Sequence, residues 1–308
     1  MRRRTALAAL TSSFAALAVG ATAAASAPPG SAAGESGPND TQSVDSAASG
    51  TIPDPAACAE GLTLEEGVLT IATGEPAYPP YVIDDDPTSG EGFESAVAYA
   101  VAAQLGFEPE QVEWVRTTFE EGFAPGLKDF DFNLQQYDIT PERQETVSFS
   151  LPYYTSNQAI VGPSDSAAAG AASLSDLQAL RFGVAAGTTS LAFVEEIIQP
   201  EAEVQVYNDN AAAVAALGAQ QIDALVADLP TALYVAAAQL DDGAVFGQFQ
   251  PTDVAPGSSF GLLFEKDNPL VECVDNAILS LRQSGELDAI TAEWMSSSIE
   301  VPFLDIDG

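Results

Sequence analysis

The hydrophobic pattern of the chain changes from a strand to a helix and back to a strand within its first folded segment. Residues 68–74, VLTIATG, form an apolar run that stops at a glycine, which is typical of a buried strand. A proline-rich turn, EPAYPPYV, follows it. Residues 92–107 then carry apolar side chains at helical spacing, closed by Gly106, and residues 112–119 return to a strand pattern. The pattern therefore predicts a β-α-β opening.

The same alternation continues along the rest of the chain. Strand patterns occur at RFGVA, VQVYN and IDALVAD, and each is followed by a helical pattern. A further strand is predicted within residues 257–268, and two helices after it run to Met295. Strands that alternate with helices predict a mainly parallel sheet with helices on both faces, and the number of segments predicts two such units.

The first 27 residues predict a signal peptide for export. Arg2, Arg3 and Arg4 precede an apolar run, and small residues near its end suit signal cleavage. The general secretory route and the twin-arginine route both fit this pattern. No other apolar run reaches the roughly 20 residues that cross a bilayer, and no cysteine directly follows the leader for lipid attachment. The mature chain is therefore expected outside the cytoplasm, extracellular or at the cell surface.

Residues 28–66 are predicted to be a flexible tether, because their first thirty positions are mostly Ala, Ser, Gly, Pro and Asp with almost no large apolar side chain. The tether contains Cys58, and Cys273 is the second of two cysteines. An even pair in an exported chain predicts a disulfide bond. This bond would tie the start of the fold to its end. We therefore assign residues 67–154 and 258–308 to a first lobe and residues 155–257 to an inserted second lobe.

The composition excludes several classes of function. The 308-residue chain has nine Lys and Arg against 45 Asp and Glu, and three of the nine lie in the leader. Binding to nucleic acid or to an anionic membrane surface is not expected, because both need many cations. There is no histidine, so a Ser-His-Asp relay and a typical zinc site are excluded. No EF-hand-like loop occurs, and no cofactor is expected.

Arg143 is the notable residue in this acidic chain. It lies in DFNLQQYDITPERQETVSFSLPYY, just past an apolar segment. A planar guanidinium donates two parallel charge-assisted hydrogen bonds to a carboxylate. Arg143 is therefore a candidate for binding an anionic group. The alternative is a surface ion pair with Glu142 or Glu145, worth at most about 1 kcal/mol.

The order of EPAYPPY, DFNLQQYDITPERQETVSFSLPYY, RFGVAAGTT, IDALVADLP and SGELDAITAEW resembles the family 3 extracellular solute-binding proteins, the amino-acid receptors of ABC importers. The resemblance covers about residues 67–300. It implies an α/β, two-lobed, type II periplasmic-binding-protein-like fold that closes on its ligand like a hinge. It also implies a monomer that binds a small-molecule amino acid and docks on an ABC transporter permease in the membrane.

The resemblance further implies the roles of individual residues. Arg143 would bind the α-carboxylate of the ligand, together with the turn of Gly187, Thr188 and Thr189, which opens a helix with free backbone N–H groups. Asp228, at the end of IDALVAD, would accept the α-ammonium, although it is also suited to cap the next helix. Tyr78 would lie over the ligand, whereas Tyr81 is interpreted as a core residue.

Some positions depart from the family pattern. Gln135, Gln136 and Asp138 stand where relatives more often have small hydroxyl residues or glycine. Asp138 would either join Asp228 on the ammonium or pair with Arg143. Glu75 matches a position where relatives that bind basic amino acids carry an acid. These acids predict a cationic or strongly polar amino acid as the ligand.

Other functions remain open on the same fold. A compatible solute such as ectoine also joins a carboxylate to a delocalised cation. A cyclohexadienyl dehydratase-like enzyme would use Glu75 or Asp138 as a general acid, but no second catalytic partner is evident, so no enzymatic activity is expected. A sensor ectodomain would normally continue into a membrane helix, and none follows residue 308.

Overall fold

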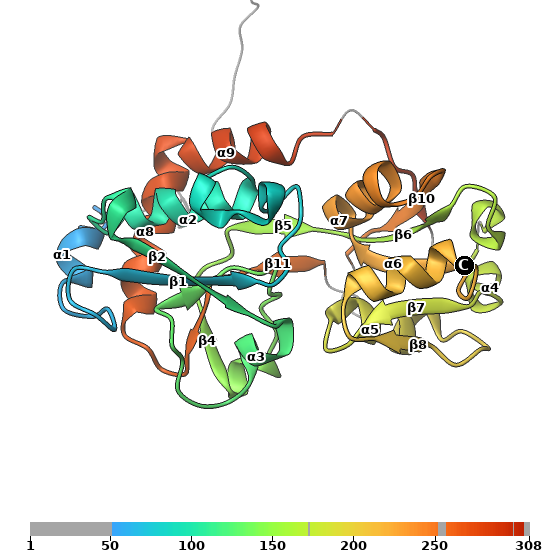
Figure 1. Cartoon of the computed structure of the whole chain (residues 1–308), viewed down its shortest axis with the longest axis horizontal. Helices are drawn as coiled ribbons and strands as arrows, with labels where there is room; N and C mark the ends of the chain where they lie inside the picture. Colours follow the sequence, from blue (N-terminus) through green and yellow to red (C-terminus); the bar gives the residue numbers. More distant parts are fainter. Residues whose placement is uncertain (1–50, 172, 252–256, 298, 305–308) are drawn as a thin grey trace, which may run out of the picture. The chain divides into compact units, whose positions relative to one another are not determined.

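A computed structural model describes residues 51–171, 173–251, 257–297 and 299–304. The signal peptide predicted for residues 1–27 and the first part of the predicted tether lie outside these residues. Across the described ranges, no helix is both long enough and apolar enough to cross a bilayer. The described chain forms two large sheets with helices around them and a two-stranded sheet, β11-β5 (Figure 1).

The first sheet is built around β1, which is almost fully buried. Its strand order is β2-β1-β3-β12-β4, with β1 parallel to both of its neighbours and β12 antiparallel to both of its own. The strands are β1 (Leu69–Gly74), β2 (Val112–Thr117), β3 (Phe132–Asn133), β4 (Val147–Phe149) and β12 (Leu263–Glu265). The helices of this lobe are α1 (Pro55–Ala59), α2 (Phe93–Gln104), α3 (Phe119–Phe123), α8 (Leu270–Ser284) and α9 (Glu286–Trp294).

The second sheet has the order β13-β10-β6-β9-β7-β8 and is also mixed. Its strands are β6 (Gln158–Pro163), β7 (Phe182–Ala185), β8 (Gln205–Tyr207), β9 (Ala224–Asp228), β10 (Gly243–Phe249) and β13 (Phe303–Leu304). Its helices are α4 (Leu174–Gln178), α5 (Thr189–Phe193), α6 (Asn210–Gly218) and α7 (Leu229–Tyr234). Both sheets are mixed because β6 runs antiparallel to β9 and β10, and β12 runs antiparallel to β3 and β4, where the alternation alone predicted mainly parallel sheets.

Two short strands link the sheets. β5 (Tyr154–Ser156) pairs antiparallel with β11 (Ser258–Phe260), so the chain enters the second sheet and leaves it at the same place (Figure 1). β5 and β11 are therefore the two crossings between the lobes, and they lie next to the boundaries assigned from the sequence, between residues 154 and 155 and between residues 257 and 258. Paired strands with few residues can change their backbone angles without disturbing either core, which suits a hinge.

The fold begins earlier than expected. Residues 55–59 form α1, capped by Asp54, and Ala59 is buried in the core that includes Cys273. The disulfide Cys58–Cys273 is present and confirms the predicted pairing. The tether prediction is therefore wrong for this part of residues 28–66. The segment lacks large apolar side chains, but its small residues and the disulfide are enough to fix it on α8.

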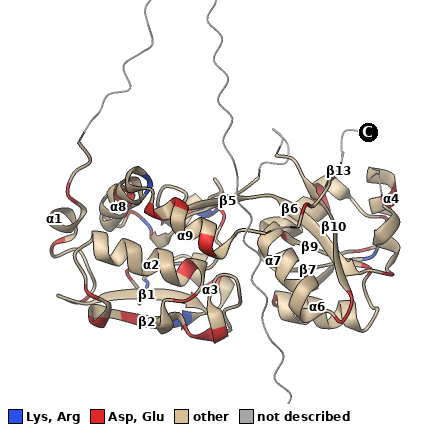
Figure 2. Cartoon of the chain, turned by 90° about the horizontal axis from the view of Figure 1, so that it is seen from above, with Lys and Arg blue, Asp and Glu red and all other residues tan. Residues whose placement is uncertain are grey.

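The C-terminal segment also differs from expectation, because it does not stay with the first lobe. After α9, residues 303–304 pair with β10 in the second sheet as β13 (Figure 2). Val301 is 8% exposed, and its carbonyl accepts a hydrogen bond from Gln248 Nε2 at 2.9 Å. β12, α8 and α9 pack with the first sheet, whereas the last described strand, β13, belongs to the second.

Candidate functional site

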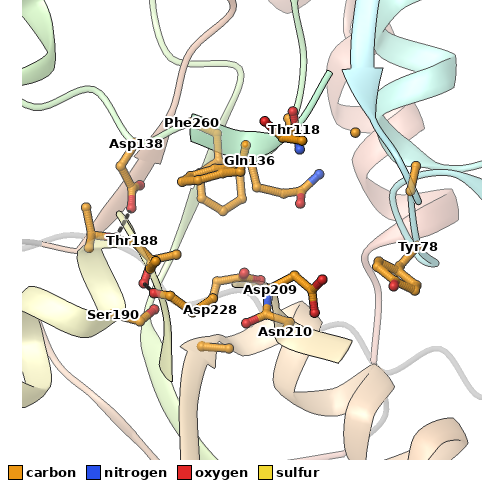
Figure 3. A pocket seen from close by; sticks show the side chains of 18 of the residues that line it. Tyr78, Thr118, Gln136, Asp138, Thr188, Ser190, Asp209, Asn210, Asp228 and Phe260 are labelled. Carbon is orange, nitrogen blue, oxygen red and sulfur yellow. Dashed lines mark hydrogen bonds between the residues drawn. The ribbon is translucent and has the colours of Figure 1, made fainter. Parts of the chain in front are cut away.

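A cavity of about 260 Å³ lies where the C-terminal ends of strands from both sheets meet. Loops at the carboxyl ends of strands are the usual ligand sites of open α/β sheets. Figure 3 shows Gln136, Asp138 and Phe260 on one side of the cavity and Ser190, Asp209, Asn210 and Asp228 on the other. Nine of the ten predicted ligand-binding residues line it, namely Glu75, Tyr78, Gln135, Gln136, Asp138, Arg143, Thr188, Thr189 and Asp228.

Gly187 is the tenth predicted residue, and it contributes its carbonyl group beside the cavity instead of lining it. Its φ of +69° is in the left-handed region, which glycine adopts without strain. The carbonyl accepts a hydrogen bond from Arg143 Nη2 at 2.9 Å. The turn at the start of α5 therefore contacts the guanidinium directly across the two lobes.

Arg143 is buried, with 8% of its surface exposed. Its Nη1 donates to the backbone carbonyl of Asp138 at 2.9 Å, and its guanidinium carbon lies 5.3 Å from the ring centre of Phe119 and 5.1 Å from that of Phe123. Burial lowers the pKa of Arg143, but an arginine stays protonated in proteins. Within the described ranges no ion pair joins it to Glu142 or Glu145. The guanidinium is therefore a fixed, desolvated cation in the cavity wall.

Asp138 is also buried, with 6% of its surface exposed. Its Oδ2 accepts a hydrogen bond from the Thr189 hydroxyl of the opposite lobe, whereas its Oδ1 has no hydrogen-bond partner in the described part of the chain. Burial is the largest effect on the pKa of Asp138 and raises it, the Thr189 bond and Arg143 lower it, and Asp228 raises it further. The carboxylate does not hydrogen-bond the Arg143 side chain, which donates to backbone carbonyls.

Asp228 ends β9 and is the N-cap of α7, which confirms the helix-cap interpretation, and its role toward an α-ammonium stays a prediction. It accepts hydrogen bonds from Thr231 N at 3.0 Å and Thr231 Oγ1 at 2.7 Å. Tyr81 OH, from the first lobe, donates to its Oδ1 at 2.5 Å. Burial raises the pKa of Asp228, and these hydrogen bonds oppose that rise.

Tyr81 was interpreted as a core residue. It is 2% exposed and packs edge-on against Phe260, as that interpretation requires. Its hydroxyl, however, also reaches Asp228 across the lobes. No sequence pattern indicates this contact, because the two residues are 147 positions apart.

Glu94 lies behind the cavity and was missed. It is 1% exposed on α2 and accepts hydrogen bonds from Gln136 N at 2.8 Å, Gln136 Nε2 at 2.5 Å and the Tyr153 hydroxyl. Burial raises the pKa of Glu94 to about 7. Gln136 has a left-handed φ of +49°, so Glu94 secures a backbone conformation that non-glycine residues rarely adopt. The sequence feature that could have indicated Glu94 is an acidic residue on the apolar face of the predicted helix.

Gln135, which directly precedes Gln136, is held in place by hydrogen bonds from two hydroxyl groups. Its Oε1 accepts hydrogen bonds from Tyr137 OH at 2.9 Å and Thr117 Oγ1 at 3.3 Å, and its side chain packs over Gly74. A Cβ at Gly74 would lie 2.7 Å from Gln135 Nε2. The two glutamines are therefore parts of the cavity wall with fixed side chains.

The other end of the cavity is more exposed and acidic. Glu75 and Asp209 are both exposed, and they line the cavity together with Tyr78. Burial raises the pKa of Tyr78, and the charges of Asp209 and Asp85 add to that effect. Asp209 was missed although it directly precedes a helix; its Oδ1 caps α6 by accepting from Ala212 N at 2.7 Å. These two exposed carboxylates add to those of Asp138 and Asp228 in the lining of the same cavity.

The described residues contain no cluster of three or more side chains that could hold a metal ion. Figure 2 shows how few Lys and Arg side chains the described chain carries among its acids. The chemistry of the cavity is therefore that of one guanidinium, several carboxylates and uncharged hydrogen-bonding groups.

Comparison with known proteins agrees with this architecture. The L-cystine-binding protein TcyJ of Escherichia coli K12 is 28% identical over 239 residues, covering 76% of this chain and 85% of that protein. A probable histidine-binding protein of Campylobacter jejuni is 28% identical over 229 residues, covering 73% and 85%. Both are named as binding proteins, not as enzymes.

Among solved structures, an ancestral arginine-binding protein bound to glutamine superposes with a TM-score of 0.64 at 26% identity, covering 76% of this chain and all of that one. The sequence profile of the bacterial extracellular solute-binding proteins, family 3, matches residues 69–297. With this match and the two-lobed fold, the chain belongs to family 3 of the bacterial extracellular solute-binding proteins.

Proposed function

We propose that the chain is the extracytoplasmic receptor of an ABC importer and captures a cationic or strongly polar amino acid between its two lobes. The observation that carries the proposal is one buried cation, Arg143, in the same cavity as carboxylates from both lobes, Asp138 and Asp228. A zwitterion needs this pairing, since each of its charged groups then meets an opposite charge in place of water.

The charge of the cavity supports a ligand with an additional cationic group. Arg143 is its cationic lining residue, and the lining acids are Glu75, Asp138, Asp209 and Asp228. A neutral zwitterion brings one positive and one negative charge, so it leaves the net negative charge of the cavity unchanged. A basic amino acid brings one more positive charge, which would lie beside Glu75 and Asp209 at the exposed end. The similarity to an ancestral arginine-binding protein agrees with this choice.

Closure around the ligand would depend on hydrogen bonds between the lobes. The Tyr81 hydroxyl donates to Asp228, the Arg143 guanidinium donates to the Gly187 carbonyl, and the Thr189 hydroxyl donates to Asp138. All of these would break when β5 and β11 let the lobes separate. A ligand that contacts both lobes stabilises the closed form over the open one. The closed form would then dock on a membrane permease as a monomer.

A thermal-shift screen tests the proposal. The panel holds the twenty amino acids, ornithine, polyamines, ectoine and hydroxyectoine, at low and high salt. A ligand that binds the folded state raises its melting temperature. We expect the largest shifts with arginine, lysine, ornithine, histidine or glutamine. Tight binding of leucine or glutamate by calorimetry, with none of those five bound, would contradict the predicted ligand class.

The same panel separates the alternatives. A shift with ectoine that exceeds every amino acid would favour a compatible-solute receptor. Incubation with prephenate or arogenate tests the dehydratase alternative, and we expect no turnover. Within the described residues, Asp138 and Asp228 are both committed to hydrogen bonds across the lobes, which suits binding more than proton transfer.

A further inference from the structure

Glu94 is a buried carboxyl group to which the proposed receptor function gives no role. It is 1% exposed on α2 and lies behind the wall of the cavity. Its Oε1 accepts hydrogen bonds from the backbone N of Gln136 at 2.8 Å and from the Tyr153 hydroxyl, and its Oε2 accepts from Gln136 Nε2 at 2.5 Å. Gln136 lines the cavity, so Glu94 is connected to the ligand site through this residue.

The two oxygens of Glu94 differ in the number of donors that they accept. Oε1 accepts from two donors, whereas Oε2 accepts from the side-chain nitrogen of Gln136. An ionised carboxylate only accepts, but a protonated one carries an O–H group that donates. Oε2 is therefore the oxygen on which a proton disturbs fewer hydrogen bonds. A proton there faces the Gln136 side-chain nitrogen, which is a donor as well.

The amide of Gln136 can accommodate this change by a half turn about its last side-chain bond. The oxygen and the nitrogen of a glutamine amide have nearly the same shape, so the turn exchanges an acceptor for a donor at little steric cost. The backbone stays in place, because the N–H of Gln136 is bonded to Oε1 of Glu94. When Glu94 is ionised, the amide nitrogen donates to it and the amide oxygen is free. When Glu94 is protonated, the amide oxygen accepts from it and the amide nitrogen is free.

The surroundings of Glu94 place its change of charge near neutral pH. Burial raises its pKa to about 7, the hydrogen bonds that it accepts oppose this rise, and the charge of Asp228 adds to it. The other titratable groups that interact with it are Tyr81, Tyr137 and Tyr153, and burial raises the pKa of each of these phenols, with the charge of Glu94 adding to the rise. These tyrosines stay neutral, so Glu94 is the member of this group that titrates near neutral pH.

We propose that Glu94 is a positioning residue of the ligand site, whose charge determines whether the Gln136 amide presents its oxygen or its nitrogen to the cavity. This inference rests on the proposed amino-acid receptor function. The proton on Oε2 comes from the solvent and returns to it, and no other covalent bond changes. The negative charge of Glu94 and the free amide oxygen of Gln136 both attract a cationic ligand, and protonation removes both. The affinity for a cationic amino acid should therefore fall as the pH decreases.

Calorimetry with L-arginine between pH 5.5 and 7.5 tests the effect on binding. We expect the wild type to bind arginine about fivefold more weakly at pH 5.5 than at pH 7.5, a ratio at the lower end of the usual coupling between two sites. By the same linkage, binding at pH 6.5 should release protons to the buffer. Glu94→Gln is neutral at every pH, so its affinity should change less and it should release fewer protons. Asp138, Asp228 and the ligand titrate equally in both proteins, so parallel affinity profiles would overturn the proposal.

Two further variants separate the amide of Gln136 from the charge of Glu94. Gln136→Met removes the amide and keeps Glu94, so we expect a smaller ratio between the affinities at pH 7.5 and pH 5.5 than in the wild type. Glu110→Gln changes an exposed acid and should keep the wild-type profile. Thermal unfolding without ligand verifies that each variant folds. A Gln136→Met protein with the full wild-type ratio would mean that Glu94 acts without Gln136, and the proposal would fail.

Nuclear magnetic resonance tests the change of the amide without any ligand. In ¹H–¹⁵N spectra, the side-chain NH₂ signals of Gln136 are those missing from the Gln136→Met protein. We expect these signals to shift with pH in the wild type, with a midpoint near the pKa of about 7 of Glu94, and to stay in place in Glu94→Gln.

The two measurements distinguish this proposal from the function on which it rests. If arginine binds and the Gln136 signals do not shift in the wild type, only the role of Glu94 is refuted. If arginine does not bind, the tightest amino acid of the screen replaces it in the calorimetry. If the signals shift and no amino acid of the screen binds, the receptor function fails, while the link between Glu94 and Gln136 is supported.

Discussion

Burial is what makes the charged residues of this cavity specific. A guanidinium in water gains little from a carboxylate, because the solvent competes for both. Arg143 is instead enclosed by two phenylalanine rings and two backbone carbonyls. A ligand carboxylate that reaches it loses its own water and gains a fixed cation. The contribution of Arg143 to binding should therefore be large.

We predict that Arg143→Ala weakens binding of the preferred amino acid by roughly 3 to 5 kcal/mol, because it leaves the ligand carboxylate buried and uncompensated. Isothermal titration calorimetry measures the loss. Arg181→Ala is the matched control: its side chain is 48% exposed and pairs with Asp223 in the second lobe, away from the cavity lining. An Arg143→Ala protein that binds as tightly as the Arg181→Ala protein would refute the role of Arg143.

Glu94 predicts a pH dependence of stability. Burial raises its pKa from 4.5 in an unfolded chain to about 7 in the folded protein. The folded state thus holds this proton more tightly, so the contribution of Glu94 favours folding fully below pH 4.5 and is lost as the pH rises to 7. The loss is about 3 kcal/mol. Glu94→Gln should therefore reduce the decline in the free energy of unfolding over this interval.

Urea unfolding at pH 5, 6, 7 and 8 measures this effect. The comparison concerns the pH slope, since Glu94→Gln also replaces an acceptor of three hydrogen bonds and can destabilise at every pH. Glu110→Gln, at an exposed position, is the control and should keep the wild-type slope. Identical slopes for all three proteins would mean that Glu94 does not titrate in this range.

At the scale of the elements, sequence patterns predicted the secondary structure of the long periodic segments and missed the short elements. The runs at β1, α2, β2, β7 and β9 are long enough for burial to impose a period. β3 and β13 have two residues each, too few for any period. α1 is built on small residues and a proline. Its place depends on a disulfide to α8, a contact 215 positions away.

The disulfide should carry much of the stability of α1. We predict that replacing Cys58 and Cys273 with serine lowers the free energy of unfolding by about 2 to 5 kcal/mol, because the unfolded chain regains the freedom of a long loop. Thermal unfolding reports this as a lower melting temperature. A reductant should lower the melting temperature of the wild type and leave the double variant unaffected. A double variant as stable as the wild type would mean that packing alone holds α1.

The predicted site residues line one cavity for a similar physical reason. Arg143, Asp228 and the turn before α5 lie in motifs where chemistry and local structure coincide, such as a strand end or a helix start. Glu94, Asp209 and the hydroxyl of Tyr81 join the site through contacts between elements far apart in the chain. Composition and spacing contain no information about which distant elements meet.

For the whole molecule, the feature that no pattern indicated is the return of the C-terminal segment to the second lobe. The backbone of β13 adds a strand to β10, and Gln248 binds this segment twice: its N donates to Pro302 O and its Nε2 to Val301 O, both at 2.9 Å. Gln248 Oε1 also accepts from Asn157 Nδ2 at 2.8 Å, directly after β5. The segment is thus connected through one side chain to the strand pair between the lobes.

We predict that ending the chain after Glu300 lowers the free energy of unfolding by about 3 to 4 kcal/mol. The estimate combines two lost hydrogen bonds at about 1 kcal/mol each with the loss of buried Val301 at roughly 1.5 to 2 kcal/mol. Urea unfolding of the truncated and full-length proteins measures it. Phe303→Ala is the control, because its side chain is 52% exposed and its backbone pairing remains; it should cost less than about 0.5 kcal/mol. Equal stabilities of the truncated and full-length proteins would mean that β13 rests on the second sheet without stabilising it, and the two crossings at β5 and β11 would then suffice to hold the lobes.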